Sequence, residues 1–104
     1  MKNIVVLITA ADKKEAKKIA GGLINQRLAA CVNIVDKVNS LFWWRGKVDR
    51  AEEALLIVKS KRSAFKRIVQ AVKRLHSYEV PEIIALPIIE GEKKYLEWLN
   101  DSVR

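Results

Sequence analysis

The chain has 104 residues, which is enough for one small domain (residues 1–104) and too few for two. Its hydrophobic fraction of 50% excludes an intrinsically disordered chain. Lys and Arg number 20 against 12 Asp and Glu, a net charge of +8, but the basic residues are scattered. A solvated surface of mixed charge is therefore favoured, and we expect no nucleic-acid partner.

The chain contains one cysteine, Cys31, so no disulfide forms within it, and this suits a reducing compartment. The first twelve residues place a lysine before an apolar run, as a signal peptide does. Removing them would delete the most apolar strand candidate of a small fold. We therefore interpret the run as a buried strand and expect a cytoplasmic protein, with no segment that spans a membrane.

The first half of the chain predicts a strand, a helix and a second strand. Residues 3–9 are continuously apolar and β-branched, which is typical of a strand buried on both faces. Residues 11–28 follow a helical period, with Asp12 as N-cap. Gly21 and Gly22 weaken this helix, which indicates that another segment approaches it closely.

Residues 30–44 predict a long strand that bends near Asp36. Strict alternation would place Val32, Ile34, Val38, Phe42 and Trp44 on one of its faces. Arg45 and Gly46 predict a tight turn, and the chain returns through a buried strand at 54–58.

The remaining elements complete a β-α-β-β-α-β order. Residues 63–76 predict a helix capped by Ser63, residues 82–89 a strand that contains Pro87, and residues 92–100 a short final helix. This order is the α+β, ferredoxin-like split βαβ arrangement. Right-handed crossovers place the first and third strands in the centre of the sheet and the second and fourth at its edges.

The predicted hairpin over residues 30–60 is far longer than the usual strand of about 5–6 residues. Its distal part must extend beyond the sheet, and a small domain cannot bury the aromatic side chains that it carries. We expect these side chains, with two from the last helix, to form an interface between subunits: Phe42, Trp43, Trp44, Tyr95 and Trp98.

Four segments, 26–35, 40–48, 76–88 and 90–99, resemble the CutA divalent-cation-tolerance family in order and spacing. Together they cover nearly the whole chain. The resemblance implies a ferredoxin-like protomer with a long hairpin, a compact homotrimer shaped like the PII signalling proteins, and a link to tolerance of copper and other divalent cations. The chain departs from the family pattern at Ser77, where a proline is usual, and at Phe42, where a tyrosine is usual.

Three residues are candidate ligands for copper or another divalent cation: Cys31, His76 and Glu82. Cysteine and histidine are suitable ligand types, but the spacing supports no closed metal site. Cys31 is equally interpreted as a small core residue, and His76 as the residue that ends a helix. If His76 ends the helix, residues 76–83 serve mainly as the connection between that helix and the next strand.

Arg27 and Lys59 end their predicted elements and are candidates for an anion-binding pocket, with Trp44 and Tyr78 as further wall residues or as packing residues. Three functions follow as hypotheses. The first is a homotrimer that binds a metal or small ligand at clefts between subunits. The second is a scaffold that docks another protein. The third is a Cys31/His76 enzyme, which lacks a clear third catalytic group, so we expect no enzyme.

Overall fold

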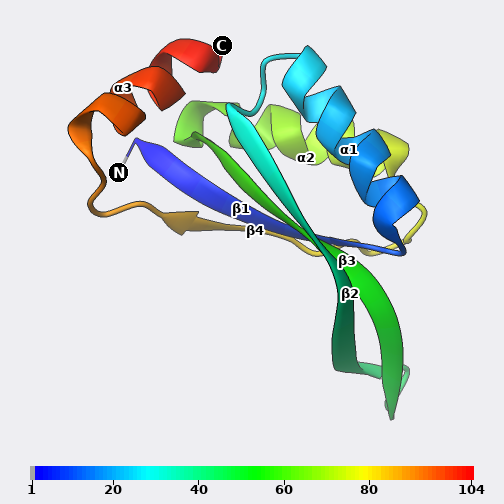
Figure 1. The fold of residues 1–104 in the computed structure, drawn as a ribbon. Coiled ribbons are helices and arrows are strands. Elements are labelled where there is room, and N and C mark those ends of the chain that lie inside the picture. The colour runs from blue at the N-terminus through cyan, green and yellow to red at the C-terminus, as the bar shows by residue number, and fades with distance from the viewer. Residues whose placement is uncertain (1) are drawn as a thin grey trace.

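The computed structural model describes residues 2–104 as a four-stranded sheet with three α-helices (Figure 1). The elements in chain order are β1 (Asn3–Ala10), α1 (Lys13–Asn25), β2 (Cys31–Trp44), β3 (Lys47–Lys61), a 3-10 turn (Arg62–Ala64) that leads into α2 (Phe65–Leu75), β4 (Ile83–Pro87) and α3 (Lys93–Ser102). The strand order is β2-β3-β1-β4, and all neighbouring strands are antiparallel. The predicted central and edge strands are therefore confirmed.

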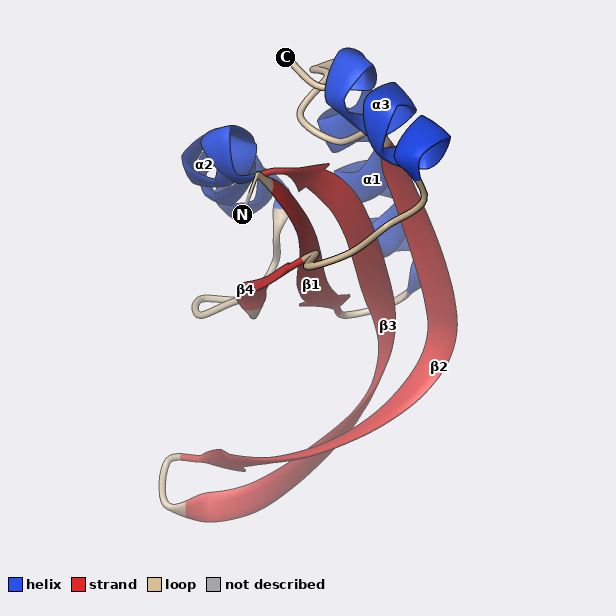
Figure 2. Cartoon of the chain, turned by 90° about the vertical axis from the view of Figure 1, so that its left-hand side faces the viewer, coloured by secondary structure: helices blue, strands red, loops and turns tan. Residues whose placement is uncertain are grey.

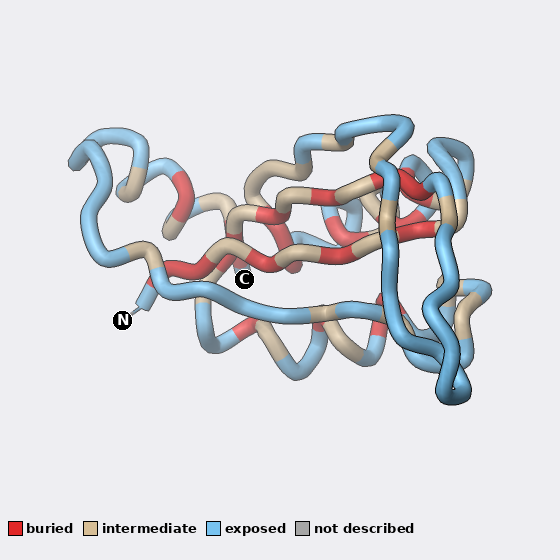
Figure 3. The backbone as a smooth tube through the Cα atoms, turned by 90° about the horizontal axis from the view of Figure 1, so that it is seen from below, coloured by how far each residue is buried: buried red, intermediate tan, exposed pale blue. Residues whose placement is uncertain are grey.

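Helices α1 and α2 cover one face of the sheet, and α3 lies at the end remote from the hairpin tip (Figures 1 and 2). The buried apolar side chains of β1 and β3 point toward this helical layer. Buried and half-buried residues alternate along both strands, as the red and tan segments of Figure 3 show. A strand buried on both faces was predicted for residues 3–9, and within this chain that prediction is wrong. The other face, which we call the open face, is not covered by α1 or α2 and carries half-buried Val5 and Leu7.

Local contacts explain where the helices begin and how closely they pack. The Asp12 carboxylate accepts the Glu15 N–H at 2.8 Å, which confirms the predicted N-cap. Ser63 is not a cap, because the 3-10 turn intervenes and α2 begins after Ala64 without a side-chain cap. A Cβ atom at Gly22 would lie 2.8 Å from Leu75 Cδ1, so the predicted close approach comes from α2.

The predicted bend of the hairpin is a β-bulge. Val35 pairs with Leu55 but Val38 pairs with Glu53, so Asp36 and Lys37 together oppose one residue, and Lys37 adopts φ 57°. The extra residue reverses which face each later side chain occupies. Val32 and Ile34 face the helices, whereas the side chains beyond the bulge at alternate positions lie on the open-face side: Val38, Ser40, Phe42 and Trp44. The predicted strict alternation is wrong for this reason.

Beyond the bulge the hairpin extends away from the rest of the protein (Figure 2). The whole chain, hairpin included, measures 44 × 26 × 22 Å. Arg45 (φ 52°) and Gly46 (φ 77°) form the predicted turn, in which both residues have positive φ. All residues from 41 to 50 are exposed, and Trp43 is 75% exposed. Across residues 2–104, no helix is both long and apolar enough to cross a membrane.

Candidate functional site

A groove of about 770 Å³ opens where the hairpin leaves the sheet. Its walls come from the end of β1, the two hairpin strands and the segment between α2 and β4. Its lining residues are Thr9, Asn39, Ser40, Leu41, Phe42, Trp44, Asp49, Arg50, Ala51, Glu53, Tyr78, Glu79, Val80 and Glu82. Because Thr9, Glu53, Phe42 and Trp44 all lie on the open-face side, the groove is continuous with the open face.

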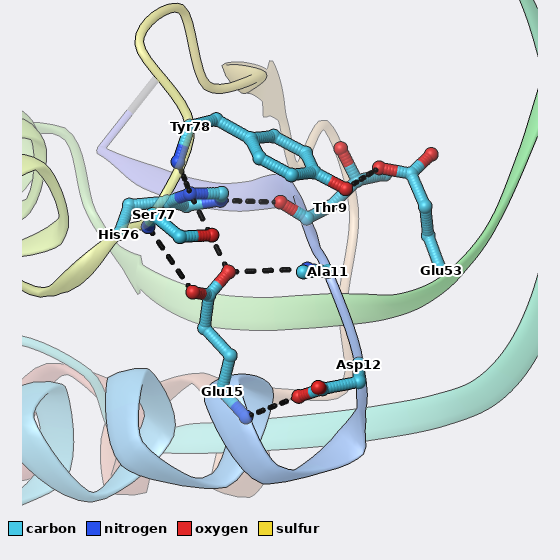
Figure 4. A network of polar contacts seen from close by, with 8 residues as sticks. All are labelled: Thr9, Ala11, Asp12, Glu15, Glu53, His76, Ser77 and Tyr78. Atoms are coloured by element: carbon cyan, nitrogen blue, oxygen red, sulfur yellow. Dashed lines mark hydrogen bonds and ion pairs between the residues drawn. The ribbon is translucent and has the colours of Figure 1, made fainter.

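One hydrogen bond joins two walls of the groove. The Tyr78 hydroxyl donates to Glu53 Oε2 at 2.8 Å (Figure 4). Burial, followed by the hydrogen bond and the negative charge of Glu53, raises the pKa of Tyr78 well above its usual range. The phenol therefore stays protonated at neutral pH and holds the 76–82 segment against β3.

His76 connects this segment to β1 through hydrogen bonds of its ring. Its imidazole has no exposed surface. Nε2 lies 2.6 Å from the Thr9 carbonyl oxygen, which only accepts hydrogen bonds, and Nδ1 lies 3.0 Å from the Tyr78 N–H, which only donates. The partners therefore assign the neutral tautomer with the proton on Nε2, and the lone pair of Nδ1 is occupied. The interpretation of His76 as the joint after α2 agrees with its position as C-cap.

Glu15 connects the joint to α1 (Figure 4). Its carboxylate accepts the N–H groups of Ser77 and Ala11, each at 3.1 Å, and lies 3.5 Å from His76 Nδ1. Burial acts to raise the pKa of Glu15. Hydrogen bonds from Ser77 and Ala11 act to lower it, and the net result is that the pKa of Glu15 lies below its ordinary value. The backbone after α2 is thus held by a carboxylate.

The three predicted metal ligands do not meet within one chain. Cys31 aligns across β3 with Val5, whereas the His76 ring contacts Thr9; at about 3.3 Å per residue those two positions of β1 are about 13 Å apart. Glu82 is exposed and lines the groove. Over residues 2–104, no three His, Cys, Asp or Glu side chains are grouped closely enough to hold a metal ion.

Cys31 is half-buried at the start of β2, with its Sγ 3.8 Å from Asn33 Oδ1. Burial, and then the charge interaction with Cys31, raise the pKa of Tyr95 on α3. Lys59 Nζ contacts Asn33 Oδ1 on the same face. Cys31 therefore belongs to the α3 end of the open face and not to the groove.

The four residues of the predicted ligand pocket separate into two places. Trp44 and Tyr78 line the groove. Arg27 adopts φ 56° after α1 and donates from Nε to the Ser102 carbonyl at 3.2 Å, while Lys59 contacts Asn33. The structure therefore brings the two aromatic residues together and assigns both basic residues to the other end of the molecule.

Sequence reasoning did not assign Thr9, Glu15, Glu53, Asp49 or Glu79 to the site. One signal was available for Glu53, because it is an acidic residue directly before the apolar run at 54–58. At 7% exposure it is buried. The other residues reach the groove or its support only through the curvature of the hairpin and the path of the 76–82 segment.

The fold and the groove define a small α+β protein with a four-stranded antiparallel sheet, one open sheet face and a ligand-sized groove at the base of a long hairpin. The family model described as CutA1 divalent ion tolerance protein matches residues 4–102. This chain belongs to the CutA1 family, as the four sequence segments predicted.

Two curated relatives are each 49% identical to this chain. One is the divalent-cation tolerance protein CutA of Thermus thermophilus, over 94% of this chain and 95% of the relative. The other is the chloroplastic protein CutA 1 of Oryza sativa, over 98% of this chain, which spans only 58% of that relative.

Solved structures show the same fold. The divalent cation tolerance protein (Cut A1) of Thermus thermophilus superposes with a TM-score of 0.96 at 47% identity, covering 98% of this chain and 99% of that one. CutA1 from Oryza sativa gives a TM-score of 0.96 at 48% identity over 100% and 95% of the two chains.

Proposed function

We propose that this protein serves divalent-cation tolerance as a homotrimer of ferredoxin-like, PII-like protomers, and that it binds a divalent cation such as copper, or a small ligand, at clefts between subunits. Membership of the CutA1 family and the names of its relatives support the role in cation tolerance. We propose binding and not catalysis as its biochemical activity.

The observation that carries this proposal is that the groove and the open apolar face share one side of the sheet. Exposed apolar side chains continue across that face from β2 to β4: Val35 (44% exposed), Ile84 (50%) and Leu86 (49%). Apolar surface of this kind favours burial by another subunit. A second copy packed against it would border the groove, and the groove would become a cleft between subunits.

A metal site built from the predicted ligands requires more than one subunit, because Cys31 and Glu82 lie at different ends of the sheet in one chain. Cys31 is likewise distant from His76 within one chain. The His76 ring would also have to lose its bond from the Tyr78 N–H before it ligated a metal. Cys31 and Glu82 from neighbouring subunits are therefore the first candidates, and a single half-exposed thiol suits the reducing cytoplasm in which we propose that the protein works.

Light scattering at micromolar concentration tests the assembly. The proposal expects about three times the chain mass of 11.9 kDa. A folded protein that stays monomeric over this concentration range would overturn the trimer and, with it, the clefts between subunits.

Calorimetric titration with copper tests the metal site. Cys31→Ala and Glu82→Gln should each weaken copper binding without a comparable loss of folding stability, and Glu97→Gln, an exposed residue of α3, serves as the control. Equal copper affinity in the wild type and in both variants would exclude Cys31 and Glu82 as ligands.

A further inference from the structure

The lining of the groove contains both apolar and acidic residues. The large apolar residues are Leu41, Phe42, Trp44 and Val80. The acidic residues are Asp49, Glu53, Glu79 and Glu82, and Arg50 is the one cation among the described lining residues; Phe42 and Asp49 are cross-strand partners, so the two kinds alternate around the groove. The groove is therefore acidic, although the chain as a whole has a net charge of +8.

Among the acidic residues of the groove, Glu53 says most about which ligand would bind. It is 7% exposed, and its carboxylate accepts a hydrogen bond from the neutral Tyr78 hydroxyl. Within residues 2–104, no Lys, Arg or His forms an ion pair with it. A buried carboxylate without a counter-charge is costly, and a cation bound in the groove would remove that cost.

The neighbouring aromatic side chains restrict what that cation is. Phe42 is 38% exposed and Trp44 43% exposed, on the same side of the hairpin as Glu53. Exposed aromatic faces attract both apolar groups and cations. Over residues 2–104, no three of these carboxylates are grouped so that they could hold a metal ion within one chain. The aromatic side chains beside them favour an organic cation over a bare one.

We propose that the groove binds an organic cation, an ammonium group carried on an aromatic or alkyl body, with the cation paired to Glu53 and the body against Phe42 and Trp44. The inference rests on the proposed function in one respect, that the groove is a ligand site. A volume of about 770 Å³ accommodates a molecule of this class.

The probe is 2-phenylethylammonium, and 2-phenylethanol is its uncharged match. Titration of the wild-type protein, followed by calorimetry and by the amide resonances of Glu53, Tyr78 and Glu79, should show the ammonium binding at least about tenfold more tightly than the alcohol. Equal affinity for the two, or shifts confined to residues outside the groove, would overturn the proposal.

Two variants with matched controls test the residues. Glu53→Gln keeps an acceptor for the Tyr78 hydroxyl but removes the charge, so affinity for the ammonium should fall by about tenfold or more. Glu52→Gln removes a charge from the next residue, which lies outside the groove, and should leave affinity unchanged. Trp44→Leu should weaken binding more than Trp43→Leu, because Trp43 does not line the groove.

Circular dichroism of each variant confirms folding, and Glu79→Gln provides a second charge removal if Glu53→Gln fails to fold. Equal losses in Glu53→Gln and Glu52→Gln would overturn the proposal. Light scattering and copper calorimetry on the same samples separate it from the proposed function. A trimer that binds copper but not 2-phenylethylammonium would reject this inference alone, whereas a monomer that binds the ammonium in the groove would reject the trimer and retain the inference.

Discussion

Two halves of one hairpin differ in how they are stabilised. The covered half, Cys31–Val35 with Ala54–Lys61, packs against α1 and α2, and Ala54, Leu56, Val58 and Ser60 are buried in it. The free half, Val38–Glu53, is also antiparallel along its length, in a register shifted by the bulge, yet all of residues 41–50 are exposed. The comparison shows that strand pairing extends well beyond the apolar core, which stops at the bulge, and that, among residues 38–53 of the described chain, Glu53 is the one buried residue.

The halves meet at Glu53, which is why the groove forms there. The Glu53 side chain lies on the open-face side, away from α1 and α2, so its covering comes from the segment after α2, and Tyr78 supplies it through its bond to Glu53. The predictions that follow test this division, beginning with the largest expected effect.

Truncation of a core side chain should separate the halves most clearly. Leu56 is 0% exposed, so Leu56→Ala should lower the free energy of unfolding by about 2–5 kcal/mol. Leu41 is 66% exposed in the free half, and Leu41→Ala should change the free energy of unfolding by no more than about 0.5 kcal/mol. Denaturant unfolding at one protein concentration measures both, and similar losses would mean that the free half is covered in the assembled protein.

The boundary between the halves depends on Tyr78. Tyr78→Phe removes the hydroxyl that contacts Glu53 and leaves a buried carboxylate without a partner, so stability should fall by about 1–3 kcal/mol. Tyr95→Phe, at a 42% exposed residue of α3, is the matched control and should have little effect. Thermal unfolding of both variants tests this, and equal shifts in melting temperature would contradict a special role for the Tyr78 hydroxyl.

Glu15 anchors the segment that carries Tyr78, and its contribution should depend on pH. Its pKa is lowered in the folded state, so its stabilisation is present above the ordinary value of 4.5 and is lost as pH falls through the folded pKa. At pH 7, Glu15→Gln should lower the free energy of unfolding by about 1 kcal/mol.

The difference in the free energy of unfolding between wild type and Glu15→Gln should shrink as the pH falls from about 6 to about 3. This range includes the pKa of about 4.3 that a glutamate has in an unfolded chain. Denaturant unfolding across this range measures it. Glu97→Gln, at an exposed position of α3, provides the control. A difference that stays constant with pH would show that the Glu15 charge does not stabilise the joint.

The smallest effects are expected from two glycines. Gly46→Ala places a side chain at φ 77° in the turn of the free half and should cost about 1 kcal/mol. A Cβ atom at Gly21 would meet no heavy atom within 4 Å, so Gly21→Ala should stabilise α1 by about 0.5–1 kcal/mol. Opposite signs in denaturant unfolding would support both assignments, whereas a loss of stability in Gly21→Ala would contradict the open surroundings of that residue.

The sequence by itself determined the order of the elements, the central and edge strands, the turn at Arg45-Gly46 and the N-cap at Asp12. These features depend on residues close together in the chain or on the handedness of crossovers, so periodicity and turn chemistry reveal them. The resemblance of four segments likewise identified the family. The α2 cap at Ser63 was wrong because a 3-10 turn, which periodicity does not distinguish, begins the helix.

The tertiary structure decided the composition of the site. The bulge at Asp36 and Lys37 reversed the faces of the distal strand and turned Phe42 and Trp44 to the groove, a change that a count of alternating residues cannot register. Placement along the sheet separated Cys31 from His76, and hydrogen bonds with the Thr9 carbonyl of β1 and the Tyr78 N–H occupied both nitrogens of the His76 ring. Glu53 gained its chemical significance from a partner 25 positions away, because burial and pairing are properties of the folded chain.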